Sequence, residues 1–374
     1  MKKIGIITFH NSYNCGSMLE SFAILKIMQK IDSDAELIDF SNQGQKNLYK
    51  VFFKCNSMKN IIKNCLLLPH YKRIKNNNSQ YESFKKNNFK LSKEYCYNSE
   101  LSDEDYSVVV AGSDQIWNIT IDDYDDAYFL NWVVNSKKVA YAPSFGAKNI
   151  LKYSDNPEKY SKLISEFSSL SIREENGKKW IKDLTNLDAE LLIDPTLLLD
   201  CEEYEKIMDD SCTPNEEYIF LYCPGFLRDL CDFVKKVSVK YDLPVIAWSA
   251  KSYYTKAIYT YGFKLPKYES PSVYLSLIKN AKIVFTTSFH GTIFSTIFKK
   301  VFFTLKNGGM YGDDDRVRTL LKQLHMENRL LEPNYDSDID YLKQIDYSNY
   351  DLDLTKLRER AFNYIEKNIG EINE

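Results

Sequence analysis

Short apolar runs alternate with amphipathic stretches along the first half of the chain. Apolar side chains recur at the three- and four-residue spacing of a helix in residues 18–28 and 160–167. The runs of strand length are residues 3–9, 35–40, 106–111, 137–142, 168–172 and 189–193. Strands separated by helices are typical of βαβ units, so the pattern predicts an α/β fold with mainly parallel sheets.

The alternation then starts again. Residues 202–212 form a polar stretch that ends near Pro214, and further predicted strands and helices follow it. These strands are residues 218–222, 245–248, 283–286 and 301–305, with helices at 228–241 and 272–280. We therefore divide the chain into lobes at 1–200 and 201–350. The charged amphipathic helix at 351–374 is expected to pack back across the lobe boundary.

Composition narrows the class of protein. The chain has 374 residues, of which 44% are hydrophobic and 27% are charged, and it is longer than a single core of ordinary size. A net charge of −3 gives no reason to expect nucleic acid as a partner. The longest apolar runs are far shorter than the ~20 residues that span a bilayer, and the N-terminal apolar stretch reads as a strand. We expect a soluble cytoplasmic protein.

One segment differs from the rest in charge. Residues 45–93 contain twelve Lys or Arg and a single acid, Glu82, with aliphatic and aromatic residues interleaved. We interpret residues 45–95 as a basic helical insertion into the first lobe. Its lysines are either simply solvated or form a peripheral contact with an anionic membrane surface or a lipid diphosphate, which would place the protein at the inner face of the membrane.

Ligands of doubly wound sheets collect at the loops beyond the carboxyl ends of strands, and two such loops in the first half have unusual content. After residues 3–9 comes a loop with Asn14 and Gly16, where a helix N-terminus could hold an anion or a sugar. It is neither GxGxxG nor a P-loop, and an ordinary capped turn is the alternative. After residues 106–111, a loop with Asp114 and Trp117 suits a carbohydrate, unless it caps a helix and buries its tryptophan.

Three further positions could carry chemistry. Arg173 ends a predicted strand, where a guanidinium can bind a phosphate or carboxylate or can pair with Glu174, Glu175 or Asp194. His290 lies in a strand-to-helix loop rich in hydroxyl groups, which suits a general acid or base. The acids at 313–315 precede a helix, but adjacent residues point in different directions, so we expect no metal.

The order of these segments resembles a known family. The motifs that carry the resemblance are FHNSYNCGSMLESFA, VVAGSDQIWN, YAPSFG, SIREENG, LIDPTLLL, TTSFHGTIFS and DDDRVRTLL, between residue 4 and about residue 330. They are similar to successive motifs of the polysaccharide pyruvyl transferase family. The resemblance implies a GT-B-like fold with two Rossmann-like lobes facing a cleft. It also implies transfer of a pyruvyl group from phosphoenolpyruvate to two sugar hydroxyls, forming a ketal in a cell-surface polysaccharide, with no cofactor besides that donor.

The resemblance also assigns roles to residues. It makes His290 the acid or base, and it makes Arg173 and Arg316 the groups that bind the phosphate and carboxylate of the donor. Ser288 stands where some members of the family have an arginine, so its part in donor binding is open. Asn14 and Asp114 are expected on the side of the acceptor, a sugar or a lipid-linked saccharide.

Two other functions stay open from the sequence. A GT-B glycosyltransferase that uses a nucleotide sugar would need a base-stacking aromatic residue and a diphosphate-binding residue, which Trp248 and Lys251 could supply. A catalytically silent sugar-binding homologue is the third reading. Retention of Arg173, His290 and Arg316 together argues against it. The sequence does not indicate an oligomeric state.

Overall fold

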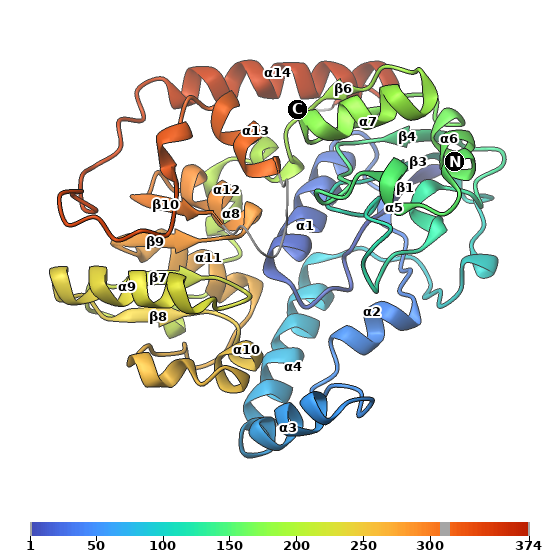
Figure 1. The fold of residues 1–374 in the computed structure, drawn as a ribbon. Helices are drawn as coiled ribbons and strands as arrows, with labels where there is room; N and C mark the ends of the chain where they lie inside the picture. The colour runs from blue at the N-terminus through green and yellow to red at the C-terminus, as the bar shows by residue number, and fades with distance from the viewer. Residues whose placement is uncertain (1, 307–314, 373–374) are drawn as a thin grey trace.

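The first lobe is a parallel α/β unit. The structure is a computed structural model that describes residues 2–306 and 315–372 (Figure 1). Its first sheet has the strand order β2-β1-β3-β4, and a parallel bridge between Val139 and Ser169 extends it toward the pair β5-β6. These strands are β1 (Lys3–Ile7), β2 (Glu36–Leu37), β3 (Tyr106–Ala111), β4 (Lys137–Ala140), β5 (Ser171–Ile172) and β6 (Glu190–Leu191).

The second lobe repeats this plan. Its parallel sheet has the order β11-β10-β9-β7-β8. The strands are β7 (Ile219–Tyr222), β8 (Val245–Ala247), β9 (Ile283–Thr286), β10 (Phe302–Leu305) and β11 (Leu330–Leu331). In each lobe the first strand lies between the second and the third, so the strand order reverses between β1 and β3 and between β7 and β9. Such reversal points are where α/β sheets bind ligands.

Helices cover both sheets. Those of the first lobe are α1 (Cys15–Gln29), α2 (Gln43–Leu48), α3 (Met58–Leu67), α4 (Tyr71–Asn88), α5 (Ile150–Tyr153), α6 (Pro157–Ser165) and α7 (Glu175–Thr185). Those that follow are α8 (Cys201–Glu205), α9 (Arg228–Tyr241), α10 (Ala250–Thr255), α11 (Pro271–Asn280), α12 (Phe289–Ile297), α13 (Arg316–Gln323) and α14 (Tyr350–Asn368). Short 3-10 turns are η1 (Leu68–His70), η2 (Asn98–Glu100), η3 (Asp126–Phe129), η4 (Pro195–Leu198), η5 (Asp210–Cys212), η6 (Ile258–Tyr261) and η7 (Glu327–Arg329).

Helix α1 joins the two lobes. It is buried on nearly all sides, and it lies at the centre of the molecule, in contact with η4, α11 and α12 (Figure 1). One apolar core therefore runs from the first sheet through α1 into the second lobe, and each lobe has a second core on the other face of its sheet. A helix buried all round needs a partner on every side, which explains why its sequence lacks a polar stripe.

Two helical segments lie outside this plan. Helices α2, α3 and α4 form an arm, with α3 at its tip, farthest from the sheets (Figure 1). Helix α14 returns across the top of the molecule to the first lobe (Figure 1). There the hydroxyl of Tyr364 donates to the carbonyl of Ala140 at 2.9 Å, and the guanidinium of Arg358 donates to the carbonyls of Leu197 and Leu199.

The expected fold class is confirmed: the chain is α/β, with two Rossmann-like lobes in a GT-B-like arrangement. Every strand proposed from the sequence is present, although several are shorter than expected. Strand β11 was not predicted, because it has only two residues, both half-buried, and too short a run to show a period. Helix α1 begins three residues earlier than predicted, directly after its polar cap Asn14.

Candidate active site

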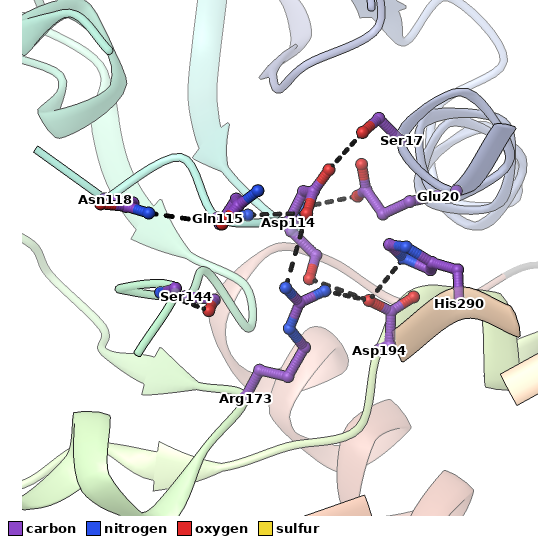
Figure 2. A network of polar contacts seen from close by, with 12 residues as sticks. Ser17, Glu20, Asp114, Gln115, Asn118, Ser144, Arg173, Asp194 and His290 are labelled. Carbon is purple, nitrogen blue, oxygen red and sulfur yellow. Dashed lines mark hydrogen bonds and ion pairs between the residues drawn. The ribbon is translucent and has the colours of Figure 1, made fainter. Parts of the chain in front are cut away.

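His290 lies where the two lobes meet. It belongs to the first turn of α12, beyond the carboxyl end of β9, and Ser288 is the N-cap whose hydroxyl accepts the N–H of Gly291 at 3.3 Å. His290 is 6% exposed, and its Nε2 lies 3.4 Å from Oδ2 of Asp194 (Figure 2). The carboxylate thus faces this edge of the ring at ion-pair distance, where it can stabilise a protonated imidazole.

The backbone of α1 closes the other side of the imidazole. A Cβ atom on Gly16 would lie 2.3 Å from Nδ1 of His290, so this close approach requires glycine. Asn14 is the N-cap of α1, and its Oδ1 accepts the N–H of Gly16 at 2.9 Å. The N-termini of two helices, one from each lobe, thus flank the histidine.

Arg173 follows β5 and is held by two carboxylates. Its Nη1 lies 2.6 Å from Oδ2 of Asp194, and its Nη2 lies 3.5 Å from Oδ1 of Asp114 (Figure 2). Its guanidinium carbon also lies 4.4 Å from the ring centre of Phe289, and the residue is only 3% exposed. The ion pair between Arg173 and Asp194, which the sequence left open as an alternative to anion binding, is thus present.

Asp194 is the centre of this group, and sequence analysis did not place it in the site. Its Oδ1 accepts the N–H and the hydroxyl of Thr196, at 3.0 and 2.6 Å. Burial alone would raise the pKa of Asp194, but His290, Arg173 and the Thr196 hydroxyl hold it well below its usual range. The available signal was the position of Asp194 in the motif LIDPTLLL, directly after an apolar run.

Asp114 and Glu20 complete the buried group. Ser17 donates its hydroxyl to Oδ2 of Asp114 at 2.6 Å, and the N–H of Ser113 donates to Oε1 of Glu20 at 2.6 Å (Figure 2). Burial opposes ionisation of Asp114, yet His290 and Arg173 lower its pKa. Burial and the charges of Asp194 and Asp114 raise the pKa of Glu20 well above its usual value, which favours its protonated form.

We name Asp114, Arg173, Asp194 and His290 the charged cluster. Its members come from four separate motifs and from both lobes, yet they form one chain of ion pairs. Glu20 was missed by sequence analysis. Its signal was a lone carboxylate in a helix whose neighbouring positions are apolar or small, an unusual place for an unpaired charge. The cluster places an imidazole beside two carboxylates and a guanidinium, and this set of groups is suited to acid–base chemistry.

Arg316 lies on the second lobe near Glu174, the residue that follows Arg173 in the chain. It is the first residue of α13 and is 7% exposed, and its charge acts on the buried carboxyl of Glu174. Burial outweighs that charge and raises the pKa of Glu174 to about 7. Next to it, Oδ2 of Asp315 accepts the N–H of Asn176 at 2.9 Å, so the start of α13 meets the start of α7. Asp313 and Asp314 lie outside the described residues.

A cavity of about 300 Å³ opens beside α1 between the lobes. Asn14 and Cys15 line it, directly before the glycine that touches His290, and Trp248 and Lys251 line it from the second lobe. Trp248 is 2% exposed and packs edge-on against Phe220, so it offers no free face to a base. Nζ of Lys251 donates to the carbonyl of Lys50 at 2.7 Å, and burial lowers the pKa of Lys251 to about 8.

Glu269 makes the stability of this region depend on pH. Its Oε1 accepts the N–H groups of Ser249 and Ala250, and its Oε2 accepts the amide of Asn77 from α4. Burial, partly offset by these hydrogen bonds and by Arg73, raises the pKa of Glu269 from 4.5 to about 7.

The stability that Glu269 contributes depends on how tightly its carboxyl binds a proton in the folded and in the unfolded chain. Between pH ~4.5 and ~7 the folded chain holds this proton more tightly than the unfolded chain, so the contribution of Glu269 to the free energy of unfolding falls as pH rises. We expect Glu269→Gln to reduce the drop in urea midpoint between pH 5 and pH 8. An identical drop in both proteins would contradict the assignment.

Three further features bear on the expectations from the sequence: Trp117, possible metal ligands and possible membrane-spanning helices. Trp117 is fully buried, stacks on Phe129 and donates its indole N–H to the carbonyl of Tyr128, so it is core and offers no platform to a sugar. Within residues 2–306 and 315–372, no group of three His, Cys, Asp or Glu side chains is placed to hold a metal ion. Over the same residues, none of the helices has the length and apolar character needed to cross a bilayer.

Solved structures show a distant likeness. UDP-GlcNAc 2-epimerase from Neisseria meningitidis, bound to UDP-GlcNAc, is 11% identical, with a TM-score of 0.46 over 100% of this chain and 95% of that one. UDP-GlcNAc 2-epimerase from Methanocaldococcus jannaschii is 12% identical, with a TM-score of 0.46 over 100% and 94%. The E. coli heptosyltransferase WaaC with ADP-2-deoxy-2-fluoro heptose is 11% identical, with a TM-score of 0.39 over 87% and 99%.

Comparison of the sequence with family models identifies the family of the chain. No curated protein sequence matches the chain significantly. The family model described as polysaccharide pyruvyl transferase matches residues 14–309, which include Asn14, Asp114, Arg173 and His290. The match covers well over half of the chain and all the motifs that form the charged cluster. The chain is therefore a transferase of the polysaccharide pyruvyl transferase family.

Proposed function

We propose that the protein transfers a pyruvyl group from phosphoenolpyruvate to two hydroxyls of a sugar and forms a cyclic ketal during the synthesis of a cell-surface polysaccharide. The acceptor is a saccharide, free or lipid-linked. The observation that carries this proposal is the charged cluster: an imidazole, a guanidinium and two carboxylates in one chain of ion pairs where the lobes meet. These residues belong to motifs inside the family match.

The reaction needs an acid, a base and a site for an anion. A proton added to C3 of the enol turns that carbon into a methyl group and makes C2 electrophilic. One sugar hydroxyl attacks C2, phosphate leaves, and a second hydroxyl closes the ring. Two protons leave the hydroxyls: one balances the proton on C3 and the other ends on phosphate. A histidine can both give and take these protons near neutral pH.

In this proposal His290 is the proton donor and acceptor, and Asp194 holds its ring in place. Arg173 supplies positive charge while it fixes Asp114 and Asp194. Asn14 and Ser288 act through the helix N-termini that they cap, because N–H groups at such ends favour phosphate and carboxylate. We assign Arg316 to direct contact with the donor. It is the first residue of α13 on the facing lobe, where it adds a second guanidinium to that of Arg173.

Titration calorimetry with phosphoenolpyruvate tests this assignment. Arg316→Gln is expected to weaken binding by at least about 30-fold, because the loss of one charged partner of a bound anion costs a few kcal/mol. Arg318→Gln is the matched control, since Arg318 is an exposed arginine on the same helix and its replacement should change nothing. Equal affinities for the two variants would remove Arg316 from the site. Binding of UDP in place of phosphoenolpyruvate would favour the nucleotide-sugar glycosyltransferase.

A further inference from the structure

Helix α3 turns all of its apolar side chains except Leu67 away from the protein. Its residues 58, 61, 62, 65 and 66 follow the helical spacing of a single stripe, and all of them are exposed. Met58 is 72% exposed and Ile62 is 56% exposed, and Leu68 of the adjoining turn η1 is 66% exposed. Exposed apolar residues are usually scattered singly, whereas a contiguous set on a helix marks a contact surface.

The polar side of α3 holds the helix in this orientation. The side chain of Asn64 accepts the N–H of Phe53 and donates to its carbonyl, both at 2.9 Å. Nζ of Lys63 lies 4.8 Å from the ring centre of Phe53, and Ser57 caps the helix by accepting the N–H of Asn60. Helix α3 also contacts α10 of the second lobe. The helix is therefore docked through these polar side chains and the buried Leu67, and the exposed stripe belongs to a fixed arrangement.

The charges around the stripe are all of one sign. Residues 50–75 contain seven Lys or Arg and no Asp or Glu, and they include the exposed residues Lys54, Lys59 and Lys72, in α3 and in the segments that adjoin it along the chain. Two copies of such a surface would repel each other, which disfavours self-association through it. An apolar helical stripe with a basic border fits the headgroup region of an anionic bilayer, where the apolar side chains enter by roughly 5–10 Å and each nearby lysine adds attraction.

We propose that α3 and η1, at the tip of the arm, dock on an anionic membrane surface. The apolar stripe enters the interface and the flanking lysines contact lipid phosphates. This proposal concerns α3, which lies well apart from α12, the helix that carries His290 (Figure 1), and it does not depend on the reaction catalysed at the charged cluster.

Vesicle co-sedimentation tests the proposal, without donor or acceptor present. The probes are vesicles of phosphatidylcholine alone and of phosphatidylcholine mixed with phosphatidylglycerol, at low and at high salt. We expect the wild type to bind the mixed vesicles, and the bound fraction to fall at high salt. Ile62→Asp should weaken binding by at least about tenfold. Val239→Asp is the matched control, because Val239 is 69% exposed on α9 of the other lobe and should leave binding unchanged.

Three outcomes would overturn the proposal. The first is absence of wild-type binding to the mixed vesicles. The second is equal weakening by Ile62→Asp and Val239→Asp. The third is a wild-type dimer in light scattering that Ile62→Asp dissociates, which would assign the stripe to self-association. Lys54→Glu with Lys59→Glu separates the electrostatic part, because these exposed lysines lie on the border and the double change should abolish the preference for phosphatidylglycerol.

Discussion

Arg173→Met is expected to lower the free energy of unfolding by about 3–5 kcal/mol, the largest effect on stability that the structure predicts. The change leaves Asp114 and Asp194 buried without the guanidinium that both contact. Methionine keeps most of the side-chain volume, so the loss comes from uncompensated charge and little from a cavity. Urea unfolding followed by circular dichroism measures the effect.

Two further variants make this result specific. Arg360→Met removes an arginine that lies 3.9 Å from Glu190 at the surface, where both side chains are about half exposed, and should cost ~0–1 kcal/mol. Arg173→Met combined with Asp194→Asn should cost less than the sum of the two single changes, because the double variant removes both members of one pair. Additive costs, or a loss no larger than that of Arg360→Met, would mean that the ion pairs of the cluster contribute little.

His290→Gln should lower the rate of pyruvyl transfer by roughly 10²–10⁴-fold, the usual contribution of a general acid or base. Glutamine preserves the approximate size of the side chain, but it cannot exchange a proton near neutral pH. The fold should therefore persist while turnover is lost. The readout is the release of phosphate from phosphoenolpyruvate in the presence of an acceptor saccharide.

The matched control for this change is His325→Gln. The side chain of His325 is 73% exposed and lies 3.9 Å from Asp353, whereas the imidazole of His290 is buried. The His325→Gln substitution should therefore leave the rate unchanged. If His290→Gln retained full activity with an unaltered urea midpoint, the histidine would have neither a catalytic nor a structural role, and the proposed mechanism would fail.

The fold was largely predictable because strands and helices alternate with clear periods. The two lobes, the parallel sheets and the motif-bearing loops all follow from short apolar runs separated by amphipathic stretches. The order of strands within each sheet could not be predicted, because the spacing of apolar residues does not indicate which distant segments pair. Strand β11 also escaped, because a two-residue strand shows no alternation.

The candidate site was only partly predictable. Asp114, Arg173 and His290 were found because each follows a predicted strand and carries a polar group that a core would not tolerate alone. Their mutual contacts were not foreseen, and Asp194 was considered only as one partner for Arg173. Its central place depends on four motifs that converge from both lobes. Ion pairs at that range of sequence separation are a property of the tertiary structure.

The orientation of α3 also could not be predicted from the sequence. The sequence identified a basic segment with interleaved apolar residues but could not say which side of the helix faces the protein. A hydrogen-bonded asparagine, Asn64, a lysine over an aromatic ring, Lys63, and the buried Leu67 face the protein instead. Ordinary amphipathic helices do the reverse, so periodicity alone would have placed the apolar stripe in the core.

The identity of the donor is the central claim, and a competition between donors tests it most directly. The wild type is incubated with a panel of free and lipid-linked saccharides and either phosphoenolpyruvate or a set of UDP-sugars, and products are analysed by mass spectrometry. We predict a saccharide that gains one pyruvyl ketal from phosphoenolpyruvate, with one phosphate released per ketal. A product formed by glycosyl transfer from a UDP-sugar, with none from phosphoenolpyruvate, would contradict the account.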